Sequence, residues 1–281
     1  MTQWPASQVK ALIHLISSET GPQAHILQEE LGQLMKQQPQ VLMKVIEQDF
    51  HSEVPISLVK AMQQVYWEEV AEKTEQFAFK INPDMEEALL LTTRFVNPAV
   101  TRQEIEGYLT DMCQALRPLL ANCTSTEDMC HVLTRFFFHV QKFSVCSSVH
   151  DIKECSFGRF LRKKYGSVLC MCCLYAVCAR RFGLDGNVID LAGRLAVRLS
   201  SQTENISLFI DPLHPQQLLT EKDCQSYIFD RNLEWNEGFV SPLSSRDVLR
   251  RFFGNMIFIL NKLHDERRLV FLRRYMDILK D

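Results

Sequence analysis

The sequence predicts an α+β fold that is predominantly helical, and three observations support this prediction. Apolar residues recur at helical spacing through roughly the first 140 residues. Short β-prone runs are confined to residues 187–210, where they predict a small antiparallel sheet. Residues 244–280 return to a helical period with one break, which predicts a terminal helical hairpin.

The N-terminal part of the chain reads as a series of short amphipathic helices. Apolar residues fall at i, i+3, i+4 and i+7 within 5–19, and similar patterns cover 23–37 and 40–49. Gly21–Pro22 is a helix stop followed by a restart. With a further helix near its end, residues 1–80 are expected to form a repeat-like helical region, although no clear repeat period is present.

Helix-capping signals mark the next elements. An "NPD" turn precedes the apolar period of 85–96. Thr101 stands three residues before Glu104, which predicts a capping box at the start of another helix. Thr124 and Ser125 are alternative caps for the helix that follows.

The pattern changes after about residue 140. Residues 141–154 read as a loop, and 156–165 and 168–182 read as two helices joined at Gly166. The β-prone runs are "NVIDL" (187–191), "LAVRL" (195–199) and "ISLFI" (206–210). The polar "SSQTEN" segment between the last two predicts a hairpin connection.

Residues 166–183, "GSVLCMCCLYAVCARRFG", place four cysteines within nine positions. On a helix with about 100° per residue, Cys172, Cys173 and Cys178 lie about 200°, 300° and 80° from Cys170. Side chains in these directions cannot converge on one metal ion. The segment is apolar on every side, so we interpret it as a central buried helix with inert thiols.

A metal site that adds residues from the preceding segment is also disfavoured. The candidates His139, Cys146, His150 and Cys155 have spacings that match no zinc pattern. We therefore expect no metal and no cofactor.

Composition narrows the class of protein. No apolar run reaches the roughly 18–20 residues that span a bilayer, and no signal peptide is recognisable at the N-terminus. Ten cysteines without a disulfide-scaffold context suggest free thiols in a reducing cytoplasm. The net charge of −3 is too mild to predict nucleic-acid binding, and the arginine pairs are read as solvated helix faces.

The order of motifs resembles the SirB family of bacterial proteins, which carry a transglutaminase-like domain. "FLRKKYG" leads into the cysteine-rich helix and its "ARRFG" end, and "LFIDP" and "LLTEKDC" follow in the family's order. The matching residues are Leu161, Gly166, Leu174, Tyr175, Ala179, Arg180, Arg181, Gly183, Ile210, Asp211, Pro212, Leu218, Leu219, Asp223 and Cys224. The resemblance implies a transglutaminase-like core over 81–245, with the hairpin 246–281 packed on it.

The resemblance also implies where catalytic residues would stand. Transglutaminase-like enzymes use a cysteine at the start of the central helix, a histidine on the next strand and an aspartate on the strand after it. These positions correspond to Val168, Arg194 and Asp211. Valine is no nucleophile and arginine keeps its proton, so the resemblance implies the fold without its chemistry. Arg194 either pairs with Asp211 or points to solvent, and the sequence leaves both open.

Two functions remain after this comparison. The first is a non-catalytic protein that binds an unknown protein partner through its helical surfaces. The second is a cysteine-dependent hydrolase or transferase with a displaced nucleophile, Cys170 or Cys172, assisted by His214. We expect the first, because Cys170 is rotated about 200° from the family position. Membrane and nucleic-acid partners are not expected.

Overall fold

The computed structural model describes residues 4–18, 23–49, 55–98, 100–201, 204 and 206–280. The chain divides into two compact units, Met1–Glu72 and Lys73–Asp281, and the division falls inside one long helix. The helix break predicted at Gly21–Pro22 lies outside the described residues.

The first unit is helical. It contains α1 (Ala6–Ser18), α2 (Ala24–Gln37), α3 (Pro39–Asp49) and most of α4 (Ile56–Ala78), which confirms the helices predicted there. Its core consists of the apolar faces of these helices. The fully buried members are Val9, Ile13, Leu31, Leu34 and Leu58.

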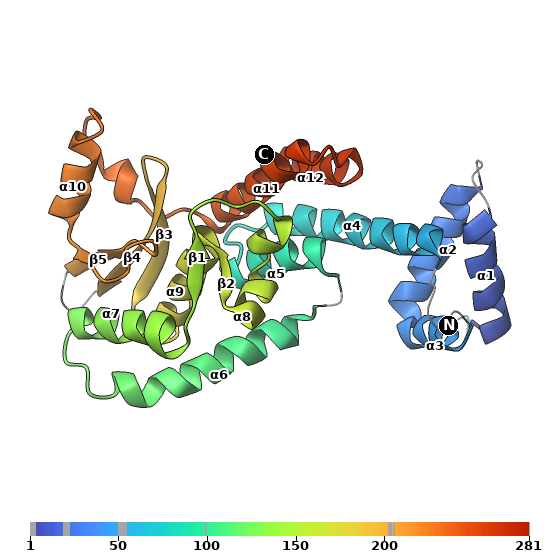
Figure 1. Ribbon diagram of the computed structural model, residues 1–281, viewed down its shortest axis with the longest axis horizontal. Helices are drawn as coiled ribbons and strands as arrows, with labels where there is room; N and C mark the ends of the chain where they lie inside the picture. The colour runs from blue at the N-terminus through green and yellow to red at the C-terminus, as the bar shows by residue number, and fades with distance from the viewer. Residues whose placement is uncertain are drawn as a thin grey trace. The chain divides into compact units, whose positions relative to one another are not determined.

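Four helical elements follow at the start of the second unit (Figure 1). These are α5 (Met85–Val96), α6 (Arg102–Leu120), α7 (Thr126–Arg135) and a π-helical turn, η1 (Phe136–Val140). The Thr101 hydroxyl accepts a hydrogen bond from the Glu104 amide at 3.2 Å and caps α6. This is half of the predicted capping box, because the Glu104 carboxylate accepts from Arg162 instead. At α7, Ser125 rather than Thr124 is the cap, since its hydroxyl accepts from the Asp128 amide at 3.1 Å.

Residues 141–167, for which the sequence predicted a loop and then a helix ending at Gly166, contain two short parallel strands. β1 (Ser144–Cys146) pairs with β2 (Tyr165–Ser167), and η2 (Ile152–Cys155) and α8 (Phe157–Lys163) lie between them in the chain. The expectation that two helices join directly at Gly166 was therefore wrong. A Cβ atom at Gly166 would lie 3.0 Å from the Glu154 carbonyl oxygen and 2.9 Å from the Phe160 ring, so only glycine fits this close pairing.

The second sheet is antiparallel, with strand order β3-β4-β5-β6. Its strands are β3 (Asp185–Leu191), β4 (Arg194–Ser201), β5 (Ile206–Ile210) and β6 (Leu218–Leu219). Ala192 and Gly193 join β3 to β4 with φ of 50° and 93°, the two positive values of a tight hairpin turn. The predicted pairing of β4 with β5 is confirmed, although residues 202, 203 and 205 of their connection lie outside the described residues.

The sheet lies between two helical layers. On one face, α9 (Val168–Arg180) packs across β3 and β4. A Cβ atom at Gly186 would lie 2.8 Å from the Ala176 carbonyl oxygen, which shows how closely β3 approaches α9. On the other face lie α10 (Glu221–Phe229) and η3 (Glu237–Val240), two elements that the sequence patterns did not reveal.

The terminal hairpin forms as predicted from α11 (Ser245–Lys262) and α12 (Glu266–Ile278), which pack on each other and, through α11, on α5. The predicted burial of the central helix is also confirmed. Every residue of α9 from Leu169 to Ala179 is buried.

Truncating the centre of α9 should therefore destabilise the protein strongly. Leu174 has no exposed surface, so L174A is expected to lower the free energy of unfolding by about 2–5 kcal/mol. The matched control is L119A, because Leu119 is a helical leucine that is 46% exposed. Denaturant melts measure both changes. A loss below about 0.5 kcal/mol for L174A, which is the range of surface substitutions, would contradict the central role of α9.

Candidate functional site

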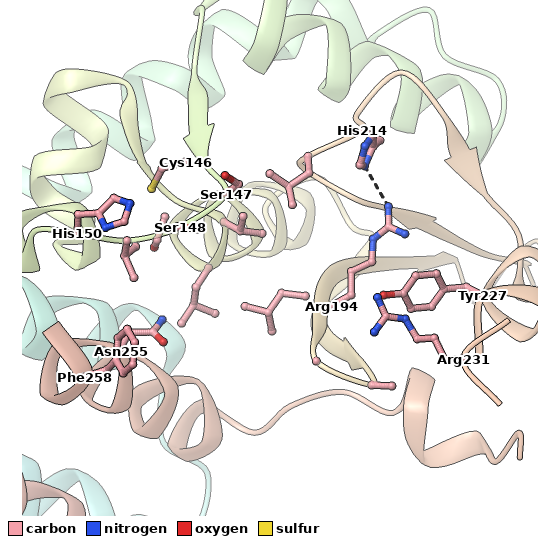
Figure 2. Close-up of a pocket in the computed structure, with 18 of the residues that line it drawn as sticks. Cys146, Ser147, Ser148, His150, Arg194, His214, Tyr227, Arg231, Asn255 and Phe258 are labelled. Carbon is pink, nitrogen blue, oxygen red and sulfur yellow. Dashed lines mark hydrogen bonds between the residues drawn. The ribbon is translucent and has the colours of Figure 1, made fainter. Parts of the chain in front are cut away.

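A cavity of about 860 Å³ opens at the N-terminal end of α9 (Figure 2). Its walls come from the segment after β1, the start of α9, the β3–β4 turn, the loop after β5, and the ends of α10 and α11. Two of the three positions singled out by the family resemblance, Val168 and Arg194, line this cavity, as does His214. Asp211 lines a smaller hollow of about 250 Å³ that it shares with Arg194 and His214.

The start of α9 is fixed at the cavity by a side-chain cap. Ser167, the last residue of β2, accepts a hydrogen bond from the Cys170 amide at 3.3 Å. Val168 is the first helical residue and is half-buried. The partial positive charge of the helix N-terminus is therefore present at the cavity, but the side chain at this position offers neither a nucleophile nor a proton.

The two cysteines considered as displaced nucleophiles point elsewhere. Cys170 and Cys172 have no exposed surface, and neither lines the cavity. The Cys170 sulfur lies 3.3 Å from the Ser167 hydroxyl and 3.6 Å from the Glu154 carbonyl oxygen. Burial raises the pKa of Cys170 to about 12 and raises the pKa of Cys172 well above its ordinary value. Both thiols are consequently protonated near neutral pH.

Arg194 and Asp211 meet at the ends of neighbouring strands. Arg194 is the first residue of β4, and Asp211 directly follows β5. The arginine Nε donates to Asp211 Oδ2 at 2.8 Å, and its Nη2 contacts the same oxygen. Of the two arrangements that the sequence left open for Arg194, the ion pair is the one observed.

His214 joins this pair although its ring is largely exposed. Its Nδ1 lies 2.8 Å from Asp211 Oδ2 and 3.1 Å from Arg194 Nη2. A protonated Nδ1 donates to the carboxylate, whereas an unprotonated Nδ1 accepts from the arginine, which is the contact drawn in Figure 2. The sequence did not indicate this contact, because it depends on the turn between Asp211 and His214.

The carboxylate of Asp211 is charged in this setting. Its side chain is only 1% exposed, and burial alone would raise its pKa. The hydrogen bonds from His214, from Arg194 and from the Leu213 amide, which lies 2.9 Å from Oδ1, outweigh burial and lower the pKa below its ordinary value. Asp211 thus holds together the start of β4 and the loop after β5.

Most of the elements that build this cavity fall within a known superfamily domain. The sequence profile of the transglutaminase-like superfamily matches residues 103–254, a range that contains the cavity's first wall, α9, the sheet and α10. The chain belongs to the transglutaminase-like superfamily. Searches of curated proteins and of solved structures each found no match.

The superfamily domain also carries cavity residues that sequence reasoning did not assign to the site. Cys146 at the end of β1 is half-buried, and its thiol donates to the Gly166 carbonyl at 3.2 Å. Burial, reinforced by the Glu154 carboxylate, raises the pKa of Cys146. Tyr227 and Arg231, from α10 and the turn after it, are two further unassigned residues of the domain. Phe258 and Lys262 of α11 also line the cavity but lie beyond the matched range.

Among the residues that the structure describes, no group of three or more His, Cys, Asp or Glu side chains is placed to hold a metal ion. None of the described helices combines the length and the apolar character needed to cross a membrane.

The Asp211 cluster should make stability depend on pH. Because the folded-state pKa lies below the unfolded value of about 3.9, its contribution is present above that pH and is lost as pH falls through the folded pKa. D211N is expected to lower the free energy of unfolding by about 1–3 kcal/mol at pH 7, and by progressively less between pH 4 and pH 2.

Denaturant melts of both proteins at each pH measure this difference. D111N is the control, since Asp111 is an exposed α6 carboxylate that forms no ion pair with any described residue. A difference between wild type and D211N that stays constant down to pH 2 would show that the Asp211 pKa is not lowered.

Proposed function

We propose that this chain is a non-catalytic member of the superfamily that binds a protein partner at the α9 cavity. The observation that carries the proposal is Val168 at the first position of α9, facing an open cavity. A site of this size suits a ligand, and a site without a nucleophile suits binding without turnover. Arg194 supports the same conclusion, because it occupies Asp211 with an ion pair and cannot act as a base.

Sequence patterns support two further parts of the proposal, the family within the superfamily and the cellular compartment. The order of motifs around α9 favours the SirB family of bacterial proteins within the superfamily. All ten cysteines are free, which is typical of proteins from a reducing compartment such as the cytoplasm.

The alternative function is a cysteine-dependent hydrolase or transferase. One observation favours it, namely that His214 is bonded to Asp211 beside the cavity, as a catalytic histidine would be. Cys146 is the thiol that lines the same cavity, whereas Cys170 and Cys172 do not. Against this alternative, the Cys146 thiol is hydrogen-bonded to a carbonyl and its pKa is raised.

Labelling with an electrophilic thiol reagent between pH 5 and pH 9, mapped by mass spectrometry, separates the two functions. In the wild type, Cys146, Cys170 and Cys172 are expected to react at least about tenfold more slowly at pH 6 than the thiol introduced by V168C. That thiol would lie in the open cavity at a helix N-terminus, which lowers a thiol pKa. Rapid labelling of a native cavity thiol, or amide hydrolysis or amine transfer above background, would establish the alternative.

Two variants make the labelling unambiguous. C113S removes the thiol of Cys113, which lies outside the cavity and could react at low pH. A hydrogen bond from Cys178 is the main cause that lowers the pKa of this thiol. V168C/R194H returns an imidazole to the position beside Asp211 and should label faster than V168C alone, because imidazole can accept the thiol proton. Equal rates for these two variants would show that the positions are not arranged as the family resemblance implies.

A further inference from the structure

The cavity is lined by cationic side chains and by no carboxylate among the described residues. Three of its lining residues carry a fixed positive charge, namely Arg194, Arg231 and Lys262. The charge of Arg194 is already offset by Asp211 in the adjoining hollow. Within the described chain, neither Arg231 nor Lys262 forms an ion pair with a carboxylate. The two charges that remain uncompensated therefore face the same cavity.

Arg231 is held in place by an aromatic ring rather than by an acid. Its guanidinium carbon lies 4.5 Å from the centroid of the Tyr227 ring, and that of Arg194 lies 4.8 Å from the same centroid. Stacking uses the flat face of a guanidinium and leaves its N–H edge available to hydrogen-bond a carboxylate in bidentate fashion. The structure thus positions Arg231 without satisfying its donors.

Lys262 repeats this arrangement at the other end of the cavity. Its ammonium nitrogen lies 4.1 Å from the centroid of the Phe258 ring on α11. Figure 2 shows Tyr227 and Arg231 at one end of the cavity and Phe258 at the other. An extended ligand with spaced negative charges matches cations at two ends of a cavity better than a compact anion such as a single phosphate.

Apolar side chains also line the cavity. Val168, Leu169, Leu195 and Leu213 all line the cavity, and Val168 and Leu195 are half-buried. Apolar surface of this kind gains free energy when a ligand covers it. The overall charge of the chain is −3, which is not the strongly basic composition that nucleic-acid binding requires.

We propose that the cavity binds an acidic peptide segment, with carboxylates at Arg231 and Lys262 and an apolar side chain on Val168 and Leu195. This inference builds on the proposed protein-binding function and specifies the chemistry of the partner. The open cavity accommodates a few residues in extended form, and the uncompensated charges select glutamate or aspartate over neutral side chains.

Selection of a random octapeptide library on the full-length protein tests the proposal, because it samples acidic and neutral ligands alike. We expect enrichment of peptides that carry two acidic residues separated by an apolar residue. A fluorescein-labelled peptide from this selection should bind about tenfold more weakly to R231E than to wild type in anisotropy titrations. Replacing its acidic residues by glutamine should weaken binding to wild type by a similar factor.

The matched control is K222E, which reverses an exposed charge on α10 outside the cavity. Binding to K222E should equal binding to wild type, and the denaturant midpoints of the variants should agree. Equal losses for K222E and R231E would mean non-specific attraction and would overturn the proposal. The same library is also selected on R231E. Enrichment of peptides without acidic residues, or no enrichment on wild type above that on R231E, would also overturn the proposal.

A competition experiment separates an acidic peptide from a small free anion. Citrate at the same carboxylate concentration should displace less than a tenth of the bound peptide, since it lacks the apolar side chain and the spacing. Displacement equal to that by unlabelled peptide would assign the site to small anions. Catalytic turnover in the activity assays would refute the proposed non-catalytic function without affecting the acidic preference. Loss of the acidic preference in the peptide experiments would refute this inference alone, so the two failures are distinguishable.

Discussion

The burial of α9 is the constraint on which the second unit depends. Eleven successive residues of this helix, Leu169–Ala179, are buried, so no part of that stretch can turn outward without exposing apolar surface. Small side chains at its surface and Gly186 on β3 allow helix and sheet to approach closely. The same packing fixes Ser167 and Val168 where β2 ends, and the position of the cavity follows from it.

A second constraint is electrostatic. Asp211 is a charged group that is almost fully shielded from water, and such a charge destabilises the fold unless partners surround it. Arg194 and His214 supply those partners from the start of β4 and from the turn after β5. The cluster therefore holds two segments of the cavity wall together, with a guanidinium contributing the fixed charge.

The sequence indicated those parts of the fold that are long and periodic, and missed those specified by tertiary contacts. The period of α11 and the apolar character of α9 are local properties, as is the Thr101 cap of α6. β1 and β2 have only three residues each, too few for any period, and their pairing depends on distant backbone. α10 buries only Cys224 and Ile228, so its apolar pattern is weak, although Thr220 and Asp223 form a recognisable capping box.

The residues of the candidate site also fall into two groups, those that the sequence indicated and those that only the structure reveals. Motif order singled out Val168, Arg194 and Asp211, because each stands at the end of an element whose position in the chain is recognisable. Arg231 and Lys262 could not be singled out, since each is an ordinary surface cation in sequence and becomes part of a site only when α10 and α11 converge on α9. The lining of an open cavity lacks packing contacts, and no carboxylate among the described lining residues offsets the charges of these two cations. A ligand that carries both apolar surface and negative charge would remove both penalties at once. The lining of this cavity therefore favours the acidic partner that we propose.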